Sequence, residues 1–224
     1  MSGDREARMM GAGEKIKIAE QVKGRRGRVT DVEKEYTLLP NRVKELLELE
    51  REALHAYKRE YMQTFRANID LVGLNGDSTT ILTAELRDVA RWSVDDLPQK
   101  TAYAVNWLPS TPELTSHLES LFGFPPETEE GAKMLCMFGL DNGLLTPDKL
   151  KELTGKFPVS GKIRYDNWWV TGTVEGMISY IHASVTQSHP EVTKEQIRDQ
   201  WGHFKIVEAS RIVDSLSTAS VGNG

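Results

Sequence analysis

The residues that most often carry out catalysis or bind metals are present in this sequence, but they form no recognisable site. The five histidines are His55, His117, His182, His189 and His203. They form neither an HExxH nor a His-x-His motif, and the chain has a single cysteine, so no zinc site is predicted. Cys136 lies among apolar residues, where a thiol is expected to be inert. Because P-loop, dinucleotide-binding and nucleophile-elbow motifs are also absent, we predict no catalytic residue, no metal and no cofactor.

A concentration of cations near the N-terminus is the clearest chemical signal. Residues 1–28 carry a net charge of +4, whereas the rest of the chain carries −9. The cations at the end of this segment, which alternate with two glycines, are Lys23, Arg25, Arg26 and Arg28. Glycine lets a backbone approach a phosphate closely, and the guanidinium fork matches pairs of phosphate oxygens. We predict that these four cations bind nucleic acid; the alternative is a solvated arm that binds nothing.

A second group of cations is interleaved with aromatic residues. Lys162 and Arg164 precede Tyr165 and the adjacent Trp168 and Trp169. Aromatic rings stack on bases while nearby cations hold phosphates, so Lys162 and Arg164 join the predicted nucleic-acid-binding residues. The two tryptophans are about 100° apart on a helix, so one of them could face a partner. The alternative, which we favour, is that they fill a helical core.

The elements that must position these residues are mostly helices. Thr-Pro-acid sequences at Thr111 and Thr146 are typical helix starts, and Gly123 and Gly155 are typical stops. Thr193 begins a capping box with a glutamine three residues later. Apolar spacing and these signals predict helices over 41–67, 78–91, 98–108, 111–123, 125–139, 146–155, 168–187 and 193–213, with one strand candidate at 157–165.

These elements predict an all-α fold, with a single helical domain of about eight helices, extended N- and C-terminal arms and at most a short β-hairpin. We divide the chain into a basic N-terminal arm (1–39), a helical core domain (40–214) and a flexible C-terminal tail (215–224). The tail is small, polar and uncharged, so it has too little apolar surface to offset the entropy lost on ordering.

Composition excludes several classes of protein. The net charge of −5 over 224 residues excludes a uniformly basic nucleic-acid-binding domain, and one cysteine excludes an intrachain disulfide framework. No apolar stretch is long enough for a transmembrane helix, and the N-terminus lacks a hydrophobic signal core. We therefore expect no membrane partner, no secretion through a signal peptide, and a cytoplasmic or virion location.

The hypothesis that accounts for most of these features is a self-assembling structural protein that packages nucleic acid, as a viral coat or nucleocapsid subunit does. Its expected partners are further copies of itself and single-stranded RNA, held non-specifically through phosphates. The layout of a helical body with two arms resembles that of filamentous virus coat proteins and nucleoproteins, in which arms lock onto neighbouring subunits. The alternative is a cellular helical interaction or regulatory module without catalysis, with the 41–67 helix as its partner surface. An enzyme with an unrecognised helical site is a third hypothesis.

Overall fold

The computed structural model describes residues 15–23, 29–72, 78–107, 111–200 and 206–221. This part of the chain is mostly helical, with nine α-helices and two antiparallel hairpins, which confirms the prediction of a mainly helical fold. The elements are β1 (Lys15–Lys23), β2 (Val29–Thr37), α2 (Val43–Val72), α3 (Ser78–Arg91), the 3-10 turn η1 (Val94–Asp96), β3 (Gln99–Ala104), α4 (Pro112–Phe122), α5 (Glu129–Asp141), α6 (Pro147–Thr154), β4 (Val159–Arg164), α7 (Tyr165–Gly172), α8 (Val174–Thr186), α9 (Lys194–Gln200) and α10 (Ile206–Val221).

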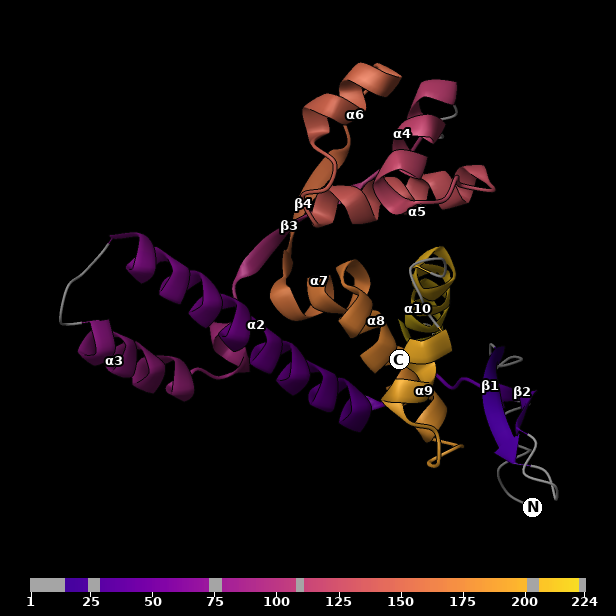
Figure 1. Cartoon of the computed structure of the whole chain (residues 1–224), viewed down its shortest axis with the longest axis horizontal. Coiled ribbons are helices and arrows are strands. Elements are labelled where there is room, and N and C mark those ends of the chain that lie inside the picture. Colours follow the sequence, from indigo (N-terminus) through magenta and orange to yellow (C-terminus); the bar gives the residue numbers. More distant parts are fainter. Residues whose placement is uncertain (1–14, 24–28, 73–77, 108–110, 201–205, 222–224) are drawn as a thin grey trace.

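The elements form a body, a lobe and a projection (Figure 1). The body contains α7 to α10, the first half of α2 and the β1–β2 hairpin, packed around one apolar cluster. A second cluster fills the α4–α6 lobe. The β3–β4 ribbon joins this lobe to the body, with Gln99 paired to Arg164 at the body end and Ala104 paired to Val159 at the lobe end. The second half of α2 and the antiparallel α3 project to one side.

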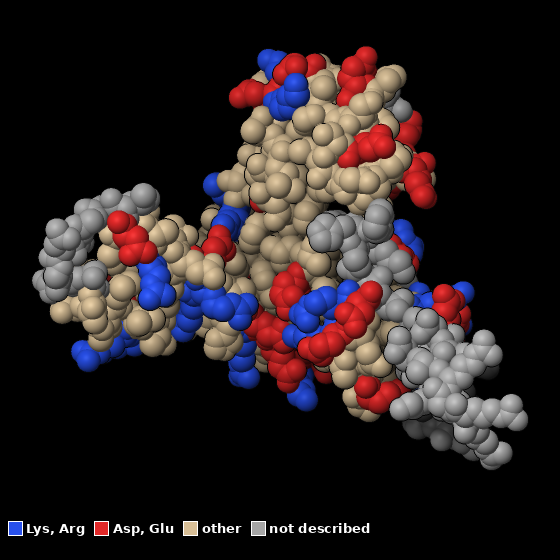
Figure 2. All heavy atoms as spheres, viewed as in Figure 1, with Lys and Arg blue, Asp and Glu red and all other residues tan. Residues whose placement is uncertain are grey.

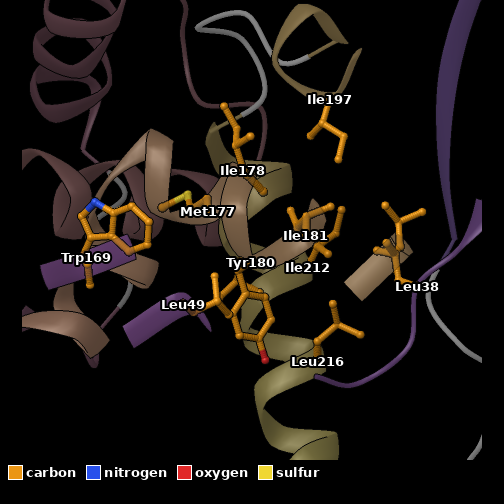
Figure 3. Packing of buried hydrophobic residues seen from close by; sticks show 14 of the residues in the cluster. Leu38, Leu49, Trp169, Met177, Ile178, Tyr180, Ile181, Ile197, Ile212 and Leu216 are labelled. Carbon is orange, nitrogen blue, oxygen red and sulfur yellow. The ribbon is translucent and has the colours of Figure 1, made fainter. Parts of the chain in front are cut away.

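Helix α8 lies at the centre of the body core. Its side chains Met177, Ile178 and Ile181 are almost completely buried, and Ile197 of α9 and Ile212 of α10 pack around them (Figure 3). The polar residues of α8 that share this environment are small serines, so the helix is apolar on nearly every side. A helix of that composition must be covered on all sides, which explains why four other elements surround it.

The predicted helix over 168–187 is two helices, because the chain breaks at Thr173. The Thr173 side chain accepts a hydrogen bond from the N–H of Gly176 (3.0 Å) and so begins α8. Gly176 also permits a very close crossing: a Cβ atom there would lie 1.9 Å from the carbonyl oxygen of Trp169 in α7. The break turns α8 back against α7 and buries both apolar surfaces.

The predicted capping signals are confirmed. Thr111 and Thr146 accept hydrogen bonds from backbone N–H groups three residues later, and the helices they begin end at Gly123 and Gly155. Both glycines have φ near +75° to +80°, a conformation that costs other residues more. The Thr193 capping box forms in both directions with Gln196. These positions follow from local chemistry, which is why the sequence predicts them.

The prediction of an extended N-terminal arm is wrong for residues 15–23 and 29–37. They form the β1–β2 hairpin, in which Ile16 and Ile18 alternate onto one face and are buried against the body with Tyr36 of β2. The apolar residues of this segment therefore belong to the main core despite the surrounding charge. The described residues consequently contain two hairpins, where the prediction allowed one.

Two further expectations fail for similar reasons. The helix predicted over 98–108 is strand β3, which pairs with the correctly predicted strand β4. The residues 215–221, predicted as part of a flexible tail, continue α10, because Leu216 extends the buried stripe of Ile212 by one helical turn. Residues 222–224 lie outside the described residues.

Candidate nucleic-acid interface

Three glutamates in the middle of α2 are paired with cations from other elements. Glu50 binds Arg164 at the end of β4. The other two pairs are Glu52 with Lys194 of α9 (2.6 Å) and Glu60 with Lys100 of β3 (3.3 Å). These three ion pairs fix α2 against the body and neutralise the three glutamates in the middle of the helix.

The arginines of α2 are left exposed. Arg51, Arg59 and Arg66 form no ion pair with any other described residue, and we call these three the α2 basic stripe. At 100° per residue their spacings of eight and seven place them within about 80° of one another, over roughly 22 Å of helix. Lys and Arg side chains gather over α2 and α3, while Asp and Glu dominate around the first turns of α2 (Figure 2). Arg51, Arg59 and Arg66 therefore form an exposed row of cations on a helix whose total charge is nearly balanced.

Lys58, which is also on α2, has a structural role instead. Its ammonium group donates a hydrogen bond to the carbonyl oxygen of Ala90 (3.2 Å), in the last turn of α3. A cation at the C-terminus of a helix satisfies an otherwise free carbonyl and interacts favourably with the helix dipole. This contact joins the two helices of the projection, so we do not count Lys58 in the stripe.

Most of the predicted basic cluster lies outside the described residues. Arg25, Arg26 and Arg28 belong to the segment that connects β1 to β2, and the structure does not describe that segment. Lys23 is the last residue of β1, and its pairing with Val29 holds the two ends of the connection together. The prediction that these cations bind nucleic acid therefore stays a prediction.

Lys162 and Arg164 are both on β4, but the structure gives them different environments. Lys162 is exposed and donates a hydrogen bond to the hydroxyl of Thr101 on β3 (2.6 Å). Arg164 binds both Glu50 and the buried carboxylate of Asp166, and these bonds raise the pKa of its guanidinium. Lys162 forms no ion pair with another described residue, whereas Arg164 is neutralised within the fold. Figure 1 places this ribbon well apart from the β1–β2 hairpin, so the two predicted groups do not form one site.

Removing Arg164 should therefore destabilise the fold. We expect Arg164→Ala to lower the free energy of unfolding by about 2–3 kcal/mol, because the buried Asp166 carboxylate loses its charged partner. Lys162→Ala, two residues away on the same strand, should change it by no more than about 0.5 kcal/mol. Urea denaturation of the two variants measures the difference. Equal stabilities would contradict the structural role of Arg164.

Both adjacent tryptophans are buried, which confirms the alternative of a helical core. Trp168 is 8% exposed and Trp169 is 4% exposed. The ammonium group of Lys100 lies 4.8 Å from the centroid of the Trp168 ring, so this lysine contributes a cation–π contact as well as its ion pair. Neither ring is available for stacking on a base.

A cavity of about 290 Å³ between the α4–α6 lobe and the body contains two carboxylates. Asp141 accepts a hydrogen bond from the N–H of Tyr103 (3.0 Å), and burial raises its pKa to about 6. Burial and the nearby Glu130 also raise the pKa of Asp214. The thiol of Cys136, in the lobe core, has its pKa raised to about 12 by burial and is therefore un-ionised at neutral pH.

Asp141 should make stability depend on pH. Its pKa in the folded chain is about 6, against an ordinary value of 3.8, so the folded state binds a proton more tightly than the unfolded state does. The contribution of Asp141 to the free energy of unfolding therefore rises as the pH falls from about 6 to about 4, and it is lost above pH 6. We expect Asp141→Asn, which keeps an acceptor for Tyr103, to be more stable than wild type near pH 7. That advantage should disappear near pH 4; urea denaturation at both values tests this, and a constant difference would contradict it.

The α2 basic stripe has a signal in the sequence, but that signal is incomplete. The charges of the 41–67 helix are dense and mixed, so by themselves they indicate one solvated face. The spacing of Arg51, Arg59 and Arg66 keeps these residues on one side of the helix. Only the folded structure shows that the neighbouring glutamates are neutralised from other elements.

Comparison with known proteins supplies no relative: no family model matches the sequence, and no curated protein or solved structure matches the chain. Within the described ranges, no three His, Cys, Asp or Glu side chains are arranged to hold a metal ion. None of the helices that the structure describes is both long and apolar enough to cross a membrane.

Proposed function

We propose that this chain binds the phosphate backbone of nucleic acid and assembles with copies of itself around it, as a packaging protein. The observation that carries this proposal is the separation of charge on α2. Three of its glutamates, at positions 50, 52 and 60, are paired with Arg164, Lys194 and Lys100, whereas the α2 basic stripe is exposed and forms no ion pair among the described residues. Cations placed in this way neutralise phosphates without reading sequence, and the released counterions make the binding depend strongly on salt.

The net charge of −5 is compatible with this role. It opposes non-specific attraction of the whole surface to a polyanion, so binding depends on the local cationic surfaces. Among the described residues, those surfaces are the α2 basic stripe and Lys162 on β4. A nucleic acid that contacted several of them would be held by charge and would remain sensitive to ionic strength.

Self-assembly is supported by an exposed apolar edge at the start of α2, formed by Val43, Leu46 and Leu47. Val43 is 73% exposed and Leu47 is 49% exposed, although both lie within a long helix that packs on the body. Leu46 also lines a pocket of about 410 Å³. Exposed apolar surface with a polar rim is typical of protein interfaces. Lys44 and Glu48 lie on this rim, with the Lys44 ammonium group 4.0 Å from a Glu48 carboxylate oxygen. The same two side chains on a second copy of the chain offer each of them a partner of opposite charge.

The experiment that tests the proposal uses the full chain with and without polyuridine. We expect size-exclusion chromatography with light scattering to show large assemblies whose ratio of absorbance at 260 to 280 nm rises when RNA is added. Electron microscopy should show regular particles. Binding measured across a salt series should weaken linearly on a log–log plot. A monomer that stays free of RNA at every salt concentration would overturn the proposal.

The second candidate is an interaction module, and the same apolar edge favours it. If the edge binds a different protein, the purified chain will remain monomeric and Leu47→Asp will leave its size unchanged. If the edge joins copies of this chain, the same variant will reduce the size of the assemblies. Because Leu47 is half-exposed, this substitution should leave the fold intact.

A further inference from the structure

Two aromatic side chains, each with a lysine near its ring, lie where the β3–β4 ribbon meets the α4–α6 lobe. Phe157 is 50% exposed, and the ammonium group of Lys151 lies 4.3 Å from the centroid of its ring. Trp107 is partly exposed, and the ammonium group of Lys156 lies 5.9 Å from its ring. We call these four residues the ribbon-end platform.

The fold brings these residues together by two simple devices. Gly155 ends α6 in a left-handed conformation and reverses the chain, which returns Phe157 to the last turn of α6, where Lys151 lies. The pairing of Ala104 with Val159 sets the two chains of the ribbon side by side, and just beyond it Lys156 of one chain lies over the Trp107 ring of the other. The position of the platform is therefore set by the end of α6 and by the pairing of β3 with β4, and backbone hydrogen bonds fix both.

The chemistry of the platform points to a ligand with both aromatic faces and negative charge. Neither lysine forms an ion pair with another residue in the part of the chain that the structure describes, so each ammonium charge is compensated only by a ring. The half-exposed Phe157 also leaves ring surface open to solvent. An unpaired nucleotide fits this combination, since its base stacks on an aromatic ring and its phosphate binds an ammonium group.

We propose that the ribbon-end platform stacks unpaired bases, so that the nucleic acid bound by this chain is single-stranded. This inference rests on the proposed function and names its substrate class. The half-exposed Val159 is the first residue of β4, two residues after Phe157, and it adds an apolar contact for a sugar. A duplex cannot use the platform, because its bases are stacked and paired inside the helix.

The test compares Phe157→Leu with Phe157→Tyr in the full chain. Leucine removes the ring but keeps an apolar side chain, whereas tyrosine keeps the ring. The probes are fluorescent polyuridine, a mixed-sequence RNA duplex and inorganic polyphosphate. We expect Phe157→Leu to weaken polyuridine binding by about 5- to 100-fold and to leave duplex and polyphosphate binding unchanged. Phe157→Tyr should restore polyuridine binding.

Salt dependence separates stacking from charge. Phe157→Leu should keep the wild-type salt slope for polyuridine, whereas Lys151→Ala should make it shallower by about 0.7, the value for one lost contact with a single strand. Phe157→Leu that binds polyuridine as tightly as wild type, or that loses affinity for all three probes equally, would overturn the platform alone. A wild-type chain that binds none of the probes would overturn both this inference and the proposed function.

Discussion

Gly176→Ala should destabilise the chain by about 4 kcal/mol or more, an exceptionally large effect for one substitution, because it forces two backbone segments apart. A Cβ atom at this position would lie 1.9 Å from the carbonyl oxygen of Trp169 and 2.5 Å from its carbonyl carbon. Both are backbone atoms, so no side chain can rotate to make room. The crossing of α7 and α8 would have to open, which would expose Trp169 and disturb the Thr173 cap.

Urea denaturation of this variant should show a much lower midpoint, together with a weaker near-ultraviolet signal from the tryptophans. The matched control is Gly161→Ala on β4, because nothing lies within 4 Å of a Cβ atom built there. That control should stay within about 0.5 kcal/mol of wild type. A Gly176→Ala variant as stable as the control would mean that α7 and α8 do not cross as described.

Replacing the three arginines of the α2 basic stripe by alanine should have the second large effect, on binding rather than on stability. If Arg51, Arg59 and Arg66 each contact one phosphate of a single strand, the log–log salt slope should become shallower by about 2 in total. The free energy of unfolding should stay close to wild type, because these side chains are exposed and form no ion pair with another described residue.

The control for this variant removes the same total charge elsewhere. Lys133, Lys149 and Arg198 are surface cations that are each paired with a nearby glutamate. Replacing these three by alanine should alter the slope far less than replacing the stripe does. Equal changes in the two triple variants would show that only net charge matters, and the stripe would then not be the contact surface.

The sequence predicts the parts of this fold that depend on local chemistry. Thr111 and Thr146 begin helices because a threonine oxygen satisfies a free N–H group within the same turn. The N–H and hydroxyl of Ser93 likewise donate hydrogen bonds to the carboxylate of Asp96 (2.7 and 2.9 Å), but the helix that begins there is only one 3-10 turn long. A capping signal fixes where a helix begins, whereas its length depends on what the following residues pack against.

The parts that the sequence did not predict depend on distant partners. Ile16 and Ile18 alternate as strand residues do, but their burial depends on α9 and α8, which are more than 150 residues away. The same holds for the candidate site. The sequence predicts that Arg164 binds phosphate, because it gives no sign that Arg164 is neutralised by Glu50, which is 114 residues away in the chain. No local pattern distinguishes a cation that the fold neutralises from one that it leaves exposed.

The pairing of Gln99 with Arg164 has a consequence for how this chain can change. The polypeptide leaves the body and returns to it at adjacent positions, so the intervening residues form an insertion whose two ends are neighbours. Shortening, lengthening or exchanging that insertion would leave Gln99 and Arg164 side by side. The α4–α6 lobe can therefore serve as a replaceable cassette, into which a reporter or a foreign binding module could be grafted above an unchanged ribbon.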